Sequence, residues 1–264
     1  MHSFSSGLLY TDFGPRTVTH SLNISDAAFR LETQTALPED EVHLWRVQLE
    51  CVAKVEERWM QMLSTDERAR AARFHFPRDR QYFTATRALL RTILASYAGC
   101  EPAEVAFRYS EKEKPSVQPG HAAEKIEFNV SHSGDVALLA FAKARSLGVD
   151  VERVRQDSDH EAIARRFFSE DEQRQLAALA PPERPAGFFR CWTRKEAYIK
   201  AQGAGLSLPL RQFDVSLKPG EANALLATRP DPTEVEHWSL QEVPAGEGYV
   251  GALCVRGNGW SLKS

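Results

Sequence analysis

The chain has 264 residues, of which 42% are hydrophobic and 26% are charged, proportions typical of a globular protein. Its 33 Lys and Arg residues against 36 Asp and Glu residues give a formal net charge of −3, which argues against a nucleic-acid-binding protein. No apolar run approaches the roughly 20 residues of a membrane-spanning helix, the N-terminus does not resemble a signal peptide, and the four cysteines are far apart. We therefore expect a soluble cytoplasmic protein without a zinc site.

The first part of the chain predicts a strand followed by helices. Residues 1–40 are polar, and we expect a partly ordered segment there. Residues 42–49 alternate apolar and polar positions, as a half-buried strand does. Ser64 and Glu67 form a capping box that opens one helix, and a proline opens a second helix over about residues 77–98.

The rest of the chain predicts more strands and two more helices. The expected helices cover 159–180 and 186–201, with a proline-rich break between them and Gly203 and Gly205 at the end. We expect the strands at 136–142 and 147–152 to pair across a short turn, and the strands at 237–243 and 249–255 to form a hairpin. The predicted strands are 105–109, 126–130, 136–142, 147–152, 213–217, 237–243 and 249–255.

This order predicts an α+β fold in two halves of similar size. Strands and helices follow one another in the same order twice, with a boundary near residue 143. We expect an N-terminal half at residues 41–142 and a C-terminal half at residues 143–264. One continuous α+β domain is the alternative.

Two carboxylates share one side of a predicted strand. Asp150 and Glu152 are two residues apart in GVDVE, so they project in the same direction. Neighbouring carboxylates repel each other, and a hard cation such as Mg²⁺ relieves that repulsion. A strand end that emerges into water is the alternative explanation.

A second group lies on the predicted helix over 186–201. Trp192, Glu196 and Lys200 follow one another at intervals of four, which places them on one helix face. A solvated ion pair beside a core tryptophan is the alternative.

Two further features favour anion binding. Ser131, His132 and Gly134 follow a predicted strand, where free backbone N–H groups and an imidazole can contact phosphate, although a polar surface turn has the same pattern. Seven arginines fall within 24 positions, and Arg87 and Arg91 share a helix face. The seven are Arg68, Arg70, Arg73, Arg78, Arg80, Arg87 and Arg91. Carboxylates, lysine and arginines together suit displacement at phosphorus.

These segments resemble a known family. GVDVE at 148–152 and WTRKEAYIK at 192–200 are similar to the two signature motifs of the 4′-phosphopantetheinyl transferases, and FNVSHSG at 128–134 and EKP at 113–115 resemble two more. GLSLPL at 205–210 and the motif spacing are similar to the Sfp-type branch.

The resemblance implies an activity and a fold. Such enzymes transfer the 4′-phosphopantetheine arm of coenzyme A to a serine hydroxyl of an apo acyl or peptidyl carrier protein and release adenosine 3′,5′-bisphosphate. The implied fold is a pseudo-twofold arrangement of two similar α+β halves with the active site in the cleft between them. A monomer is expected to suffice.

The resemblance also implies roles for individual residues. Asp150, Glu152 and Glu196 would bind Mg²⁺, or Mn²⁺, and Asp150, Glu196 and Lys200 would be catalytic. The implied contacts to coenzyme A are Arg70, Arg73, Arg87, Arg91, Lys114, Ser131, His132 and Lys200. Glu196 or a metal-bound water would accept the serine proton.

The sequence departs from the family at two positions. Glu113 replaces the usual glycine before Lys114, which affects the turn around that lysine. Arg194 stands where the family often has a smaller or apolar residue.

Two other functions are alternatives for this set of residues. A metal-dependent phosphodiesterase or nuclease also uses clustered carboxylates with a lysine, but the lysine two residues after the acid is missing, since Tyr198 and Val154 occupy those positions. A non-catalytic module that binds coenzyme A or a carrier protein is disfavoured because all three carboxylates are present.

A final pattern suggests where a carrier protein docks. Arginines precede two adjacent phenylalanines, a combination that suits an acidic helical partner. If both phenylalanines were core residues, the arginines would simply be solvated. The residues are Arg153, Arg155, Arg165, Arg166, Phe167 and Phe168.

Overall fold

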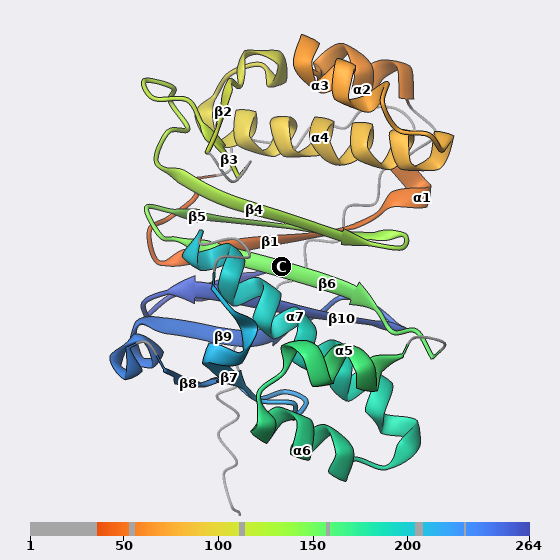
Figure 1. The fold of residues 1–264 in the computed structure, drawn as a ribbon. Coiled ribbons are helices and arrows are strands. Elements are labelled where there is room, and N and C mark those ends of the chain that lie inside the picture. The colour runs from red at the N-terminus through yellow and green to blue at the C-terminus, as the bar shows by residue number, and fades with distance from the viewer. Residues whose placement is uncertain (1–35, 53–55, 111–113, 157–158, 204–207, 230) are drawn as a thin grey trace, which may run out of the picture.

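The structure, a computed structural model, describes residues 36–52, 56–110, 114–156, 159–203, 208–229 and 231–264. Two β-sheets pack between two groups of helices, so the chain forms successive helix, sheet, sheet and helix layers (Figure 1). The fold is therefore α+β, as predicted. Within the described ranges, no helix is long and apolar enough to cross a lipid bilayer.

The first sheet has the strand order β11-β1-β5-β4. Its strands are β1 (Glu41–Gln48), β4 (Ile126–Ser133), β5 (Val136–Lys143) and β11 (Ser261–Lys263). β5 pairs antiparallel with β1 and with β4, and β11 joins β1 in parallel. The apolar run of β5 is buried on both faces: Leu139 and Phe141 pack toward the helices, and Leu138 packs toward the second sheet. The C-terminal strand thus completes the sheet that the N-terminal strand begins.

The second sheet is antiparallel, with the order β6-β10-β9. It contains β6 (Leu147–Arg153), β9 (Trp238–Val243) and β10 (Tyr249–Arg256). Two small antiparallel ladders lie outside the main sheets, formed by β2 (Phe107–Tyr109) with β3 (Pro115–Val117), and by β7 (Phe213–Val215) with β8 (Leu225–Thr228).

One group of helices packs on the outer face of each sheet (Figure 1). The first group is α1 (Leu49–Val52), α2 (Glu56–Met62), α3 (Thr65–Ala71) and α4 (Pro77–Ala98). The second is α5 (His160–Phe167), α6 (Glu170–Ala178) and α7 (Arg184–Gln202). As predicted, Glu67 caps α3 by accepting a hydrogen bond from Ser64 N at 3.0 Å, and Gly99 ends α4 in a left-handed conformation with a φ of 68°.

Helix α7 lies directly on β6 because Gly148 has no side chain. A Cβ atom at Gly148 would lie 2.2 Å from the carbonyl oxygen of Ala197 and 2.4 Å from the backbone nitrogen of Ala201. Any other residue would force the helix away from the strand. The glycine of GVDVE therefore brings the second signature motif next to the first.

Two predictions about strands were wrong. The strands at 136–142 and 147–152 do not pair with each other, since β5 pairs with β1 and β4 while β6 pairs with β10. Ser131, His132 and Ser133 do not form a turn after a strand either. They belong to β4 and pair with β5, so the turn begins only at Gly134, and their backbone groups do not form the predicted anion-binding loop.

The helix expected over 159–180 is interrupted. It forms α5 and α6, and Ser169 caps α6 by a second capping box with Glu172. The Ser-x-x-Glu pattern at 169–172 was the available signal for this boundary. Residues 1–35, Glu113 and Gly205 lie outside the described residues, so the predictions made for them stay predictions.

Candidate active site

The two sheets meet along their edge strands, β4 and β6, and side chains bridge this seam. Three β4 side chains accept hydrogen bonds from β6 backbone N–H groups: Asn129 Oδ1 from Val149 at 2.9 Å, Ser131 Oγ from Val151 at 3.4 Å, and Ser133 Oγ from Arg153 at 3.1 Å. The side chains of alternate β4 residues thus accept the hydrogen bonds that backbone carbonyls would accept in a continuous sheet. The seam therefore places FNVSHSG at 128–134 against GVDVE at 148–152.

The two serine hydroxyls also bind the carboxylates of β6. Ser131 Oγ donates to Asp150 Oδ1 at 2.7 Å, and Ser133 Oγ donates to Glu152 Oε2 at 2.6 Å. Each serine therefore accepts from the strand backbone and donates to a carboxylate. Ser133 was not among the predicted site residues, although the Ser-x-Ser alternation on a strand was a signal that could have found it.

Lys200 of α7 completes this group. Its Nζ lies 2.7 Å from Asp150 Oδ1 and donates further to Ser131 Oγ at 3.2 Å and to the Val149 carbonyl at 3.3 Å. Glu196, one turn earlier on α7, is half-buried. The structure thus gathers five predicted residues: Asp150, Glu152, Glu196, Lys200 and Ser131.

Three carboxylates in one half-buried region repel one another. Burial raises the pKa of Glu152, and the charge of Asp150 adds to this rise against the hydrogen bond from Ser133. Burial likewise raises the pKa of Glu196, with a further contribution from Asp150. A bound cation would relieve both the repulsion and the loss of solvation.

The residues fit a hard divalent cation. Asp150 Oδ2 is buried and has no hydrogen-bond partner, while its other oxygen already contacts Lys200 and Ser131. A carboxylate oxygen without a partner is costly in a protein interior unless a ligand satisfies it. No three Asp, Glu, His or Cys side chains in the described residues form a ready-made metal site.

Two adjoining cavities lie beside the seam. One, of about 200 Å³, lies between α4, β4 and the β2–β3 ladder and is lined by Arg70, Phe83, Thr86, Arg87, Tyr109, Pro115, Phe128, Asn129, Val130 and His132. The other, of about 220 Å³, is lined by Asp66, Glu67, Arg70, Arg73 and Tyr109. Arg70 and Tyr109 belong to both. We refer to the pair as the arginine cavities, because three predicted arginines reach them.

Buried Glu67 holds two predicted arginines in place. One of its oxygens lies 3.0 Å from Arg87 Nε and the other accepts from Arg91 Nε at 2.7 Å. Arg87 also donates to the Tyr109 hydroxyl, so its guanidinium borders the arginine cavities. Glu67 was predicted only as a capping residue.

The structure gives Arg91 a position that contradicts its predicted contact with coenzyme A. Its side chain is only 2% exposed, and it donates to the carbonyls of Pro102 and Val105 as well as to Glu67. Arg91 shares a helix face with Arg87, but one helical turn after Arg87 this face is covered by the core. Arg91 therefore stabilises the fold through its bonds to Glu67 and to the two carbonyls.

Two other predicted residues lie near the seam in unexpected environments. Lys114 Nζ donates to the carbonyl of Lys200 at 2.8 Å, and burial lowers its pKa. His132 reaches solvent at the rim of an arginine cavity, where desolvation by surrounding protein and the nearby Lys200 ammonium lower its pKa. The lowered pKa favours the neutral ring, which can still donate one N–H hydrogen bond to a phosphate oxygen. A bound phosphate would favour protonation of the ring, because a nearby anion stabilises the imidazolium.

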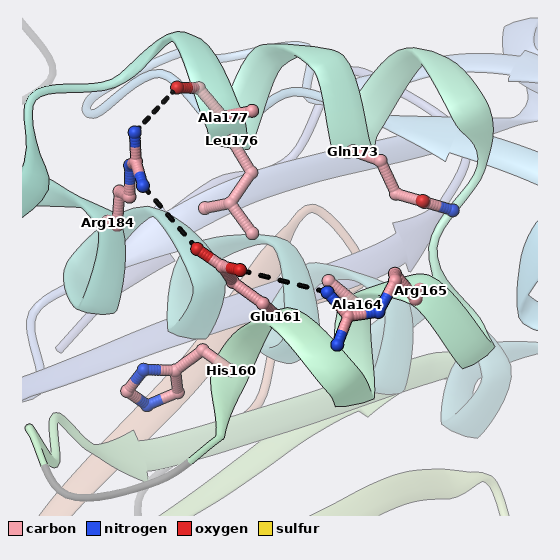
Figure 2. Close-up of a pocket in the computed structure, with 8 residues that line it drawn as sticks. All are labelled: His160, Glu161, Ala164, Arg165, Gln173, Leu176, Ala177 and Arg184. Atoms are coloured by element: carbon pink, nitrogen blue, oxygen red, sulfur yellow. Dashed lines mark hydrogen bonds and ion pairs between the residues drawn. The ribbon is translucent and has the colours of Figure 1, made fainter.

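Another cavity, of about 210 Å³, lies between α5, α6 and the start of α7 (Figure 2). Glu161 crosses it, with its carboxylate oxygens 3.7 Å from Arg165 and 3.4 Å from Arg184. It contains none of the predicted catalytic or coenzyme A-binding residues.

Comparison with known proteins agrees with the motifs. Residues 146–254 match the model of the 4′-phosphopantetheinyl transferase superfamily, and residues 51–144 match a 4′-phosphopantetheinyl transferase N-terminal model. The chain is 42% identical to the 4′-phosphopantetheinyl transferase HetI of Nostoc sp. over 85% of this chain and 91% of the relative.

Two further relatives are similar over most of their length. A putative 4′-phosphopantetheinyl transferase of Synechocystis sp. is 34% identical over 69% of this chain and 72% of its own. The 4′-phosphopantetheinyl transferase Sfp of Bacillus subtilis is 30% identical over 75% of this chain and 84% of its own. The chain belongs to the Sfp-type 4′-phosphopantetheinyl transferase family.

Proposed function

We propose that this transferase binds coenzyme A along the β4–β6 seam and moves its 4′-phosphopantetheine arm to a serine of an apo acyl or peptidyl carrier protein. The reaction requires Mg²⁺, or Mn²⁺, and releases adenosine 3′,5′-bisphosphate. The observation that carries the proposal is the meeting of Asp150, Glu152, Glu196 and Lys200 at the seam, with Asp150 Oδ2 left without a partner. We also propose that a monomer suffices.

Asp150, Glu152 and Glu196 would hold the cation, which neutralises charge on the pyrophosphate when bound. The chain's own residues do the positioning. Lys200 faces the reacting phosphate from α7. Arg70, Arg73 and Arg87 bind the nucleotide end in the arginine cavities, and His132 donates a hydrogen bond to a phosphate oxygen at their rim.

Glu196 is our candidate for the base. Its pKa is raised in the cation-free protein, and a bound cation would lower it again, so Glu196 is a far weaker base than a serine alkoxide. Proton transfer must therefore accompany attack: the serine oxygen bonds to the β-phosphorus, its proton moves to Glu196, and the bond to the departing bisphosphate breaks.

The seam also supports a two-half architecture. We propose that residues 41–142 and 143–264 are related by a pseudo-twofold axis and that coenzyme A binds in the cleft between them. β4 and β6 are edge strands of the two sheets and lie side by side, as this arrangement requires. β11 departs from the simple division because it pairs with β1.

The test is mass spectrometry of apo carrier proteins from fatty acid, polyketide and nonribosomal peptide systems, each incubated with the protein, coenzyme A and Mg²⁺. We expect one carrier at least to gain the mass of a single phosphopantetheine on its serine. Asp150→Asn, which keeps the size of the side chain, is the control and should leave the carrier unmodified. Absence of a mass gain on every carrier, together with hydrolysis of a phosphodiester substrate, would favour the nuclease alternative.

A further inference from the structure

The β4–β5 hairpin turns at the end of the seam where Glu152 lies. Its two-residue turn consists of Gly134 and Asp135, and Gly134 has a φ of 54°, which a glycine at the first turn position adopts without strain. The turn directly follows Ser133, whose hydroxyl donates to Glu152 across the seam. A group that fixes this turn therefore also fixes the position of that hydroxyl.

A tyrosine of the second sheet holds the turn from the C-terminal half. The hydroxyl of Tyr249, at the start of β10, accepts a hydrogen bond from the backbone N–H of Asp135 at 3.1 Å. It also packs directly against Gly134, since a Cβ atom at that glycine would lie only 2.6 Å from the hydroxyl oxygen. The turn can approach Tyr249 this closely because residue 134 has no side chain.

The N-terminal half holds the same turn from the opposite side. The Asp135 carbonyl accepts from the backbone N–H of Leu49 at 2.7 Å. The Asp135 carboxylate accepts from the Tyr82 hydroxyl at 2.8 Å and pairs with Arg78 at the start of α4. Three groups thus fix Asp135 to its own half, and Tyr249 connects it to the other half.

These contacts close a ring of linked residues at this end of the seam. Tyr249 lies opposite Arg153 in the β6–β10 ladder. The backbone N–H of Arg153 donates to Ser133 Oγ at 3.1 Å, and Ser133 leads into the turn that Tyr249 contacts. Glu152 precedes Arg153 on β6 and accepts its hydrogen bond from the serine of the same ring. In a closed ring, the position of each member limits the positions of the others.

We propose that Tyr249 is a positioning residue of the transferase: by holding the turn at Gly134 and Asp135, it keeps the Ser133 hydroxyl on Glu152 and so orients this candidate metal ligand. Tyr249 lines neither of the arginine cavities and acts through the turn. The inference rests on the proposed function, because it takes Glu152 as a ligand of the cation. The alternative is that Tyr249 stabilises the fold without an effect on the metal site.

The first experiment removes only the hydroxyl group, with Tyr249→Phe. Electron paramagnetic resonance of free Mn²⁺, with the protein and Mn²⁺ alone, measures the Kd without turnover. We expect the Kd for Mn²⁺ to rise about fivefold, the equivalent of one ordinary hydrogen bond. Half-maximal activity should require more Mg²⁺, and kcat should recover in excess Mg²⁺.

Tyr97→Phe is the matched control for the loss of a tyrosine hydroxyl. The Tyr97 hydroxyl contacts His43 and Trp45 at the other end of α4, away from the turn. This variant should lower the melting temperature and leave the Kd for Mn²⁺ unchanged, which separates an effect on the fold from an effect on the metal site.

A double-mutant cycle tests whether Tyr249 acts through Ser133. In the Ser133→Ala background, Tyr249→Phe should not raise the Kd for Mn²⁺ further, since the hydroxyl that it positions is already gone. Gly134→Ala disturbs the same contact from the turn, because its Cβ atom would displace the Tyr249 hydroxyl. It should raise the Kd by a similar factor, and it replaces Tyr249→Phe if that variant does not fold.

An unchanged Kd for Mn²⁺ in Tyr249→Phe would overturn the proposal. Equal rises of the Kd in the wild-type and Ser133→Ala backgrounds would also overturn it, since Tyr249 would then act on the metal site by another route. The same holds for a kcat that stays low in excess Mg²⁺. Wild-type protein that binds no Mn²⁺ would instead contradict the proposed function on which the inference rests.

Discussion

Ser133 Oγ donates to Glu152 Oε2 at 2.6 Å while it accepts from the backbone N–H of Arg153 at 3.1 Å. The hydroxyl belongs to the first sheet and the carboxylate to the second, so one side chain fixes a candidate metal ligand across the seam. Loss of a residue that orients a metal ligand in this way typically lowers metal affinity by about 10- to 100-fold.

Removal of the Ser133 hydroxyl should therefore weaken metal binding. We expect Ser133→Ala to raise the Kd for Mn²⁺ at least about tenfold, because Glu152 loses its orientation. Electron paramagnetic resonance of free Mn²⁺ measures this without turnover. Ser133→Thr keeps the hydroxyl and should restore most of the affinity. Equal Mn²⁺ affinity in the alanine variant and the wild type would show that Ser133 only joins the sheets.

The carboxylates themselves should be essential for turnover. We expect Asp150→Ala and Glu196→Ala each to reduce kcat by at least about 10²-fold, the usual scale for loss of a main charge-stabilising group, and chelator to abolish activity. Thermal melting should change little in Glu196→Ala, which removes one of several mutually repelling carboxylates, but should fall in Asp150→Ala, which leaves Lys200 and Ser131 without their carboxylate partner. Near-normal kcat in either variant, or full activity in excess chelator, would contradict the assignment.

The raised pKa of Glu196 predicts a pH-dependent stability difference in the metal-free protein. The folded state binds this proton more tightly than the unfolded state, so the wild type gains stability as pH falls through the folded pKa and lacks that stability above it. With chelator present, Glu196→Gln should melt above the wild type near pH 7, and the difference should shrink as pH is lowered toward 4. Melting curves across that range test this, with the exposed Glu247→Gln as the matched control. A variant that melts lower at every pH would exclude repulsion as the source of the shift.

Much of this site could be predicted from residue patterns, because a strand places i and i+2 residues, and a helix i and i+4 residues, on one side. That reasoning holds for Asp150 with Glu152 and for Glu196 with Lys200. It also placed Arg87 and Arg91 on one helix face, but it could not show that Arg91 is buried, since a shared face does not reveal where along that face the core begins. The pairing of β5 with β1 rather than with β6 likewise depends on contacts between residues about 95 positions apart, which local patterns do not contain.

Arg87 should determine how strongly the enzyme prefers coenzyme A to dephospho-coenzyme A. We expect Arg87→Gln to raise the KM for coenzyme A, with an unchanged carrier KM, and to reduce that preference, because the guanidinium borders the arginine cavities. Arg91→Gln is the contrasting variant. It leaves buried Glu67 with one cation fewer and should cost about 3 kcal/mol of stability. An unchanged preference in Arg87→Gln would move the contact with the 3′-phosphate to Arg70 or Arg73.

The residues predicted to dock a carrier protein on α5 differ in their exposure. Phe168 is fully buried, stacked on Phe188, so it is a core residue and cannot contact a carrier. Phe167 is half-buried against Trp192, with the Arg166 guanidinium over its ring at 5.1 Å. The Arg165 side chain is 64% exposed at the edge of the cavity in Figure 2.

Charge reversal of Arg165 and Arg166 together should raise the carrier KM several-fold and flatten its salt dependence, because exposed arginines act on an acidic partner by screened long-range attraction. Coenzyme A binding should stay as in the wild type, since neither residue lines the arginine cavities. Steady-state kinetics between low and high salt, with Arg174→Glu on exposed α6 as the matched charge control, measure both effects. If the carrier KM does not move, the basic face of α5 is only solvated, and the carrier reaches Glu196 from the side of the N-terminal helices.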